Sequence, residues 1–380
     1  MAGIYIHIPF CKQACHYCNF HFSTSLRRKT DLLEAILLEM EWRRDYLPEK
    51  AIDTIYLGGG TPSLLTRGDL ERLFEHIHRY FDIAENAEVT LEANPDDLTQ
   101  EYLKDLSGVE VNRLSIGVQS FHEEDLRFFN RAHNAIEARA CIEYAQDLGF
   151  TNLTIDLIYG SPSTSLGHWE QNLQITFDYE IPHISAYGLT VEERTALAHQ
   201  IQNGKVPAPD EEAAARQFEL LMRAMRAEGY QHYEISNFAL PGWHARHNAG
   251  YWTGEPYLGL GPSAHSFDGI SRQWNVAHNQ HYIKRMKEPP KARADAHLFE
   301  REVLSPVQRY NEYILTALRT MWGCRLKLID PDFRPHFLEH IQAHIRVEHV
   351  ERKGDAFRLT DRGKLLADRI ALDLFLEMER

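Results

Sequence analysis

The chain has 380 residues, of which 43% are hydrophobic, and its formal net charge is −14 at pH 7. A chain of this length can bury one large core and a smaller second core. The acidic balance argues against non-specific binding to nucleic acid. The sequence has no apolar run long enough to span a bilayer and shows no secretory signal pattern, so we expect a cytoplasmic protein.

Strand and helix patterns alternate along the first half of the chain. Alternating apolar residues predict a strand at 3–8, and apolar residues at helical spacing predict a helix at 30–46. The alternation continues with predicted strands at 52–57, 87–92, 112–118, 151–158 and 183–189, and predicted helices at 69–80, 99–106, 134–148 and 168–178. Strands separated by helices predict a parallel β/α fold with its site at the carboxyl ends of the strands. Periodicity alone does not separate a six-unit partial barrel from an open doubly wound sheet.

The second half of the chain is less regular. We predict connectors at 203–210 and at 286–300, the second of which contains Pro289-Pro290. Between them we predict a helix at 211–228, followed by a stretch at 231–283 that is rich in His, Gly and aromatic residues. After residue 306 the patterns predict helices at 311–321 and 335–345, a hairpin that turns at 353–355, and a helix at 361–376. Helices followed by a hairpin indicate a winged-helix-like α+β domain, which we expect to serve packing or docking.

Three of the five cysteines, Cys11, Cys15 and Cys18, follow the first predicted strand with the spacing C-x3-C-x2-C. Thiolates so close along the chain can converge on one metal centre with little loss of chain entropy. An odd trio cannot pair off as disulfides. A zinc site would need a fourth ligand, which His16 or His21 could supply. A [4Fe–4S] cluster held by three cysteines is the more specific interpretation, and it leaves one iron open to a small molecule.

A glycine run, Gly58-Gly59-Gly60-Thr61, follows the second predicted strand. Glycines let the backbone approach a ligand closely, and exposed N–H groups can bind a polar or anionic head group. A triple glycine on its own indicates only a tight turn. No Gly-Lys-Ser/Thr follows it, so it is not a Walker A loop.

Polar side chains also lie at or near the ends of later predicted strands. Glu92 ends the third, where a carboxylate could accept hydrogen bonds from a ribose diol, although a solvated strand end would look the same. Gln119 ends the fourth, and Asp156 lies within an apolar strand. A carboxylate between Ile and Leu is costly to bury unless it is paired, and we expect Arg131 to be its partner. That pair could equally be purely structural.

The cysteine spacing resembles the signature of the radical S-adenosylmethionine (SAM) family. The run Tyr5-Ile6-His7-Ile8-Pro9-Phe10-Cys11 resembles one subgroup, the oxygen-independent coproporphyrinogen III dehydrogenases and the HemW-type heme chaperones. The resemblance implies a partial (β/α)6 barrel, a [4Fe–4S] cluster and SAM as cofactors. It implies SAM contacts for Tyr5, Tyr17, Gly59, Gly60, Thr61, Glu92, Gln119, Arg131 and Asp156, the last three lying near a second SAM in the dehydrogenases.

Two features separate the branches of this subgroup. The dehydrogenases carry a further cysteine where this chain has Phe20. The run His247-Asn248-Ala249-Gly250-Tyr251-Trp252 contains H-N-x-x-Y-W, which resembles the marker of the heme-chaperone branch. A neutral imidazole suits iron and aromatic rings suit a porphyrin face. His247 is therefore the candidate axial ligand, although a lone His in a loop more often makes ordinary hydrogen bonds.

The resemblance divides the chain into a barrel at 1–202, an extension carrying the heme motif at 203–300 and a C-terminal domain at 301–380. It implies a heme chaperone that passes heme to target hemoproteins, respiratory and membrane-associated ones included. A homodimer and peripheral contact with a membrane are further expectations. The alternatives are a coproporphyrinogen III dehydrogenase that decarboxylates two propionates and, secondly, a zinc-binding interaction module.

Overall fold

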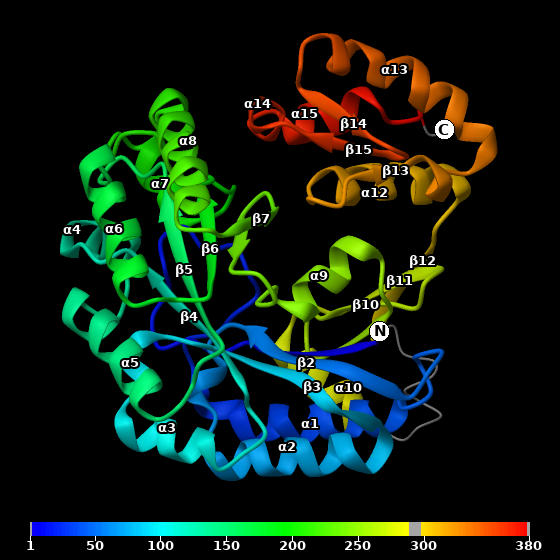
Figure 1. Cartoon of the computed structure of the whole chain (residues 1–380). Helices are drawn as coiled ribbons and strands as arrows, with labels where there is room; N and C mark the ends of the chain where they lie inside the picture. Colours follow the sequence, from blue (N-terminus) through cyan, green and yellow to red (C-terminus); the bar gives the residue numbers. More distant parts are fainter. Residues whose placement is uncertain (1, 289–297, 378–380) are drawn as a thin grey trace.

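The computed structural model describes residues 2–288 and 298–377 (Figure 1). The connector expected at 286–300, with Pro289 and Pro290, falls mostly on residues 289–297, outside the described residues. Within the two described ranges, no helix combines the length and the apolar character needed to cross a bilayer.

Six parallel strands lie side by side in chain order and form the centre of the molecule. They are β1 (Gly3–Ile8), β2 (Ala51–Gly59), β3 (Asp82–Ala93), β4 (Arg113–Gln119), β5 (Leu153–Tyr159) and β6 (His183–Gly188). The helices between them are α1 (Lys29–Trp42), α2 (Arg67–Tyr80), α3 (Gln100–Ser107), α4 (Glu123–Phe129), α5 (Ala135–Asp147) and α6 (Leu166–Asp178). Figure 1 shows α1, α2, α3, α5 and α6 along the outer side of this sheet. The expected partial (β/α)6 architecture is confirmed.

Local signals explain where these elements begin. Thr66 opens α2 through a capping box with Asp69, and Asn134 opens α5 through one with Glu137. Each box satisfies backbone N–H groups that have no partner within the helix. Short 3-10 turns complete the connections: η1 (Leu26–Arg28), η2 (Pro62–Leu64) and η3 (Pro95–Asp97).

Short strands extend this sheet on both sides to twelve strands. Next to β6 lie β8 (Asn237–Ala239) and β7 (Gln231–Glu234); next to β1 lie β9 (Tyr257–Leu260), β10 (His265–Phe267), β11 (Ser271–Asn275) and β12 (Phe299–Val303). The accompanying helices are α7 (Ala196–Gln202), α8 (Glu211–Ala227), α9 (Arg246–Thr253) and α10 (Asn279–Met286). Strands this short give too few alternations to be recognised in the sequence, so the stretch at 231–283 showed no clear period.

A buried carboxylate attaches the extension to the barrel. Glu39 of α1 is 2% exposed and accepts hydrogen bonds from Arg43 Nη1 (3.0 Å), Asn275 Nδ2 (2.7 Å), Tyr282 Oη (2.5 Å) and the backbone N–H of Gly261 (2.8 Å). Four donors compensate the cost of burying this charge. The network therefore fixes β9, β11 and α10 against α1.

The C-terminal part has its own sheet and core. Its elements are α12 (Pro306–Leu318), β13 (Cys324–Arg325), η4 (Leu326–Leu328), η5 (Pro331–Phe333), α13 (Arg334–Arg346), β14 (Val350–Lys353), β15 (Ala356–Leu359), α14 (Asp361–Lys364) and α15 (Ala367–Asp373). Helices with a three-stranded sheet are the winged-helix-like arrangement expected from the sequence. Ile314, Phe337 and Phe357 are fully buried in its core.

The prediction of a single helix at 361–376 is wrong. The chain forms α14 and α15 instead, because Leu366 leaves helical geometry with φ −123° and ψ 20°. Gly363 packs against the carbonyl oxygen of His349, where an added Cβ would lie 1.9 Å away. This contact holds α14 on the preceding turn, and the break lets α15 bury Ile370 in the C-terminal core.

Candidate functional site

The cysteine loop leaves the carboxyl end of β1 and is tied to its neighbours by polar contacts. Lys12 Nζ contacts Asp96 Oδ2 at 2.8 Å, and Gln13 Nε2 donates to Asn130 Oδ1 at 2.9 Å. His16, a candidate zinc ligand, hydrogen-bonds through Nδ1 to the carbonyl oxygen of Phe128 at 2.9 Å. The other candidate, His21, hydrogen-bonds through Nε2 to Asn279 at 2.7 Å. Both histidines thus stabilise the loop with these atoms.

The three thiols of the loop are free and partly exposed. Burial raises the pKa of Cys11 to about 11 and also raises the pKa of Cys18, so these thiols hold their protons until a metal group displaces them. Arg131 Nη1 lies 3.2 Å from Cys15 Sγ and brings positive charge to the place where a thiolate would form. In the described ranges, no three His, Cys, Asp or Glu side chains converge as a single metal ion requires. A [4Fe–4S] cluster sets a different condition, since each thiolate binds its own iron.

Arg131 joins the cysteine loop to the strand ends. Its Nη2 donates to Asn94 Oδ1 at 2.6 Å and to the carbonyl oxygen of Gly117 at 2.7 Å, and its Nη1 donates to Tyr17 Oη at 3.3 Å. Its Nε is buried without a partner among the described residues, so this donor remains available for a ligand. The residues therefore fit an anionic group held between the cysteines and the sheet edge.

The prediction of an ion pair between Asp156 and Arg131 is wrong, because the two side chains do not pair in the structure. A side chain at position 117 would crowd Arg131 Nη2, which an added Cβ would approach to 3.1 Å. Gly117 therefore lets the guanidinium reach Asn94, just after β3, rather than Asp156 on β5. Asp156 instead accepts a hydrogen bond from Ser115 Oγ at 3.5 Å. Burial raises the pKa of Asp156 to about 6.

The glycine run forms a turn that has no room for side chains. Gly59 has φ +105°, and an added Cβ would lie 2.3 Å from the ring of His7. At Gly60 an added Cβ would lie 2.7 Å from the carbonyl oxygen of Ile8. Only glycine is compatible with this geometry. The turn consequently brings its backbone directly to the cysteine loop.

Glu92 receives hydrogen bonds from two directions. Tyr56 Oη donates to Oε1 at 2.8 Å, and the backbone N–H of Gly59 donates to Oε2 at 3.0 Å. Burial, and secondly the charge of Asp156, raises the pKa of Glu92 to about 7. A carboxyl group that changes charge near neutral pH can accept a ribose diol when it is ionised.

The remaining predicted SAM residues lie at the same edge. Gln119 ends β4 in the left-handed region with φ +65°, which a non-glycine residue rarely adopts. Tyr17 packs edge-on against Phe129, and Tyr5 Oη hydrogen-bonds to His7 Nδ1 at 3.0 Å. Thr61 Oγ1 accepts from Asn94 Nδ2 at 3.2 Å. All nine predicted residues thus lie on β1 to β5 or in the segments that follow these strands, with Tyr5 and Asp156 inside their strands.

Asn94 is a site residue that the sequence reasoning did not identify. Its side chain bonds both Thr61 and Arg131 and so links the glycine turn to the cysteine loop. Its position, two residues after Glu92 at the end of a strand, was the available signal.

The heme motif lies on helix α9 rather than in a loop. The N-terminus of α9 is held by Glu88, which accepts from the backbone N–H groups of Arg246 and His247, both at 3.0 Å. An acidic group at this end satisfies orphan donors and complements the helix dipole. The interpretation of His247 as a residue in a loop is therefore wrong, and Asn248, Tyr251 and Trp252 belong to the same helix.

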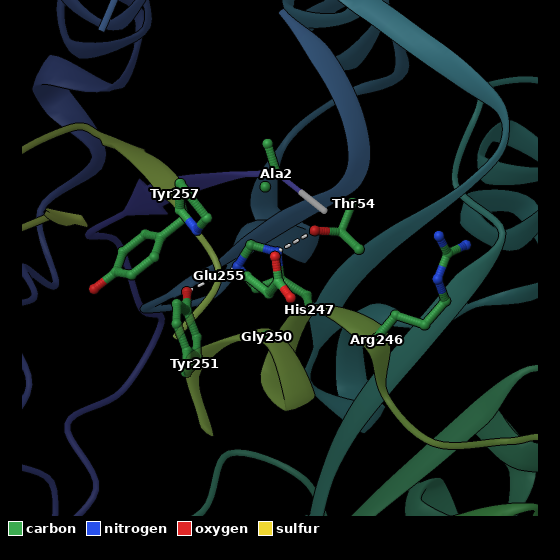
Figure 2. A pocket seen from close by; sticks show the side chains of 10 residues that line it. Ala2, Thr54, Arg246, His247, Gly250, Tyr251, Glu255 and Tyr257 are labelled. Atoms are coloured by element: carbon green, nitrogen blue, oxygen red, sulfur yellow. Dashed lines mark hydrogen bonds between the residues drawn. The ribbon is translucent and has the colours of Figure 1, made fainter. Parts of the chain in front are cut away.

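His247 is 4% exposed, and both of its ring nitrogens have partners (Figure 2). Nδ1 hydrogen-bonds to Thr54 Oγ1 at 2.8 Å and Nε2 to Tyr251 Oη at 2.8 Å. Burial lowers the pKa of His247 to about 3, so the ring is neutral at physiological pH. Its role as an axial ligand stays a prediction, and it requires one of these two bonds to open.

A cavity of about 870 Å3 lies next to the heme motif. Its walls come from α9, the cysteine loop, β10 and α12: Trp252, Tyr251, Phe20, His21, His265, Arg309 and Tyr313. The volume lies within the range of small-molecule and cofactor sites. The barrel, its extension and the C-terminal domain therefore all contribute walls to the cavity.

Comparison with known proteins matches residues 5–174 to the model of the radical SAM superfamily. The chain is 34% identical to the heme chaperone HemW of Mycobacterium tuberculosis over 98% of its own length and 94% of that protein. The identity to the HemW of Bacillus subtilis is also 34%, over 97% and 98% of the two chains. The chain belongs to the HemW family.

A solved structure shares the fold of this family member. The radical SAM enzyme coproporphyrinogen III oxidase (HemN) from Escherichia coli superposes with a TM-score of 0.83 over 98% of this chain and 90% of that one. The sequence identity is 22%, so this likeness establishes the architecture and not the activity.

Proposed function

We propose that this protein is a heme chaperone that binds heme in the large cavity and transfers it to target hemoproteins. One observation carries the proposal: Tyr251 and Trp252 of the heme motif form a wall of a cavity of about 870 Å3, which opens beside the cysteine loop. The nearly full-length similarity to proteins named heme chaperones supports it.

Cys11, Cys15 and Cys18 would hold a [4Fe–4S] cluster in this protein, with SAM beside it. The bound pair supplies the capacity to cleave SAM after reduction. The chain itself would position the cofactor: the Gly59–Gly60 turn and Thr61 would receive its polar end, and Glu92 its ribose. Tyr5, Tyr17, Gln119, Arg131 and Asp156 complete the proposed SAM surroundings.

The heme motif would shape the cavity through α9. His247 hydrogen-bonds to Tyr251 and thereby fixes the tyrosine at the cavity wall. The guanidinium of Arg319 lies 5.3 Å from the centre of the Trp252 ring and holds that ring from the side of the C-terminal domain. Asn248 is half-buried on the same helix.

The proposed acceptors are hemoproteins of respiration, including membrane-bound ones. The chaperone would reach them from the cytoplasm, with the C-terminal domain as the docking part. Homodimer formation stays a prediction.

The test is a heme titration of anaerobically purified, cluster-reconstituted protein, followed through the Soret band and then by transfer to an apo-hemoprotein. We expect saturation at an equimolar ratio and transfer to the acceptor. Anaerobic incubation with coproporphyrinogen III tests the dehydrogenase alternative, and Phe20 in place of a further cysteine leads us to expect no decarboxylation. Absence of saturable heme binding, or conversion of that substrate, would overturn the proposal.

A further inference from the structure

We infer that His265 binds the heme iron in the large cavity and that Arg309 of α12 pairs with a heme propionate, so that bound heme bridges the barrel extension and the C-terminal domain. The inference rests on the proposed function. It assigns the heme ligands outside the heme motif, because both ring nitrogens of His247 are already hydrogen-bonded.

Three histidines line the cavity: His7, His21 and His265. His7 uses both ring nitrogens, with Tyr5 Oη and the carbonyl oxygen of His21 each at 3.0 Å. His21 uses Nε2 to bond Asn279. The ring of His265 makes no hydrogen bond within the described ranges, and the residue is exposed to the cavity. His265 is therefore the cavity histidine whose ring makes no hydrogen bond, whereas His21 is held by one ring nitrogen and His7 by both.

The backbone around His265 is rigid. Arg43 donates to the carbonyl oxygen of Gly259 and to Ser266 Oγ, both at 2.9 Å, and so fixes the strands on either side of the preceding turn. Within that turn Ser263 has φ +64°, a conformation that non-glycine residues rarely adopt and that concentrates at ligand sites. A ligand held on fixed strands keeps the position that a metal requires.

The ring of His265 is also held in a form that binds iron. It stacks on Trp274 with ring centres 6.1 Å apart and an interplanar angle of 26°. Partial burial, and secondly the charge of Arg272, lowers the pKa of His265 and so favours the neutral imidazole. Neutral imidazole is the form that binds metals.

Arg309 is a positively charged residue of the cavity wall that pairs with no carboxylate among the described residues. Its Nη1 donates to the carbonyl oxygen of Leu304 at 3.0 Å, and no ion pair to it forms within residues 2–288 and 298–377. Arg272, the other arginine of the cavity, already pairs with Glu312. A propionate is a carboxylate, and the planar fork of an arginine binds carboxylates with two parallel hydrogen bonds.

The remaining walls suit the flat faces of a porphyrin. Phe20 is 69% exposed, an unusual degree for a large apolar ring, and it faces the cavity from the cysteine loop. Trp252 and Tyr313 line the cavity from α9 and α12. Burying such rings against a porphyrin is favourable, and aromatic contacts prefer offset or edge-on geometry.

The iron ligand is tested by titrating ferric heme into full-length, cluster-reconstituted protein and recording the Soret band and spin state. We expect His265→Ala to weaken heme binding about tenfold and to change the spectrum, and added imidazole to restore it. The matched control, His340→Ala, removes an exposed histidine of α13 and should leave both unchanged.

The propionate contact is tested with two forms of the ligand. We expect Arg309→Gln to weaken the binding of heme about tenfold, and to leave unchanged the binding of heme whose propionates are methyl esters. Arg369→Gln, at an exposed position of α15, is the control.

An unchanged spectrum in His265→Ala, together with a lost one in His247→Ala, would overturn the inference and leave the proposed function standing. An equal loss of heme and of its ester in Arg309→Gln would overturn the propionate contact. Wild-type protein without saturable heme binding would overturn the proposed function itself.

Discussion

Two proposed sites, the cluster edge at Cys11, Cys15 and Cys18 and the heme cavity beside α9, are built in opposite ways. At the cluster edge, the three proposed cluster ligands lie within eight residues of one loop, and Arg131 binds that loop to the sheet. In the cavity, Phe20, Trp252, His265 and Arg309 come from four distant segments, one of them in the C-terminal domain. A resident cofactor gains from a fixed frame. A cargo must be released, and a site between two parts of a protein can open when those parts move.

Ion pairs help to attach the C-terminal domain to the barrel and its extension. Arg319, at the end of α12, contacts buried Glu234 at 3.1 Å and Asp368 at 2.8 Å, and an exposed pair, Arg226 and Asp361, adds a further link to the C-terminal domain. Exposed ion pairs contribute little to stability. We therefore expect the C-terminal domain to depend strongly on Arg319.

One side chain belongs to both regions. Tyr56 donates to Glu92 at the cluster edge, and its ring stacks on His247 of the heme motif with centres 5.1 Å apart. His247 in turn hydrogen-bonds to Tyr251 at the cavity wall. This chain of contacts is a physical connection between the proposed SAM site and the heme cavity.

The largest expected effect is the loss of the iron–sulfur cluster without a loss of heme binding. In Cys15→Ala the cluster loses a ligand, so we expect iron and acid-labile sulfide to fall to background in anaerobically purified protein. Lys12, Gln13 and His16 still tie the loop in place, so saturable heme binding should persist. Cys141→Ala, which alters a buried cysteine of α5, should keep the cluster. Simultaneous loss of heme binding would show that the regions are not independent.

The second prediction concerns the pKa of Glu92. Burial raises this pKa to about 7, and the ordinary value is 4.5. The folded state therefore holds the proton more tightly, so the group favours folding at low pH and loses this contribution as the pH rises through 7. Glu92→Gln stays neutral. Without SAM, the variant should gain up to about 3 kcal/mol of unfolding free energy relative to wild type between about pH 5 and about pH 8.

Denaturant unfolding at both pH values measures this difference. Glu101→Gln, an exposed carboxylate of α3, is the matched control and should show no such trend. SAM binding measured at the higher pH should be weaker in Glu92→Gln. A stability difference that does not change with pH would contradict the assigned cause.

The third prediction tests the anchoring of the C-terminal domain. Arg319→Met removes the charged partner of Glu234, which keeps its hydrogen bonds from Ser236 N–H and Asn237 Nδ2. We expect a loss of about 2 kcal/mol in unfolding free energy and faster hydrogen exchange in α9 and α12. Iron content should not change. Arg369→Met is the exposed control, and unaltered exchange in α9 would show that the domain is held by other contacts.

The sequence predicted the cluster edge well and the cavity poorly, for a physical reason. Cys11, Cys15 and Cys18 are close along the chain, and Gly59 and Glu92 end strands of regular period, so local patterns place them together. His265 and Arg309 meet only after the extension and the C-terminal domain have packed. The motif at His247 was interpreted as part of a loop but lies on α9. Whether the His247 ring is accessible or enclosed depends on Thr54 and Tyr251, which no local pattern reveals.

The smallest expected effect lies at the junction between the two regions. Tyr251→Phe removes one hydroxyl and leaves His247 Nε2 buried without its partner. We expect a loss of about 1 kcal/mol in unfolding free energy, because an unmade buried hydrogen bond costs about this much. Heme affinity should fall only slightly if His265 is the iron ligand, since the ring of Phe still forms the cavity wall. A Soret spectrum that changes in Tyr251→Phe as much as in His247→Ala would instead place the iron at the heme motif, and the contrast between a fixed cluster edge and a cargo site shared with the C-terminal domain would no longer hold.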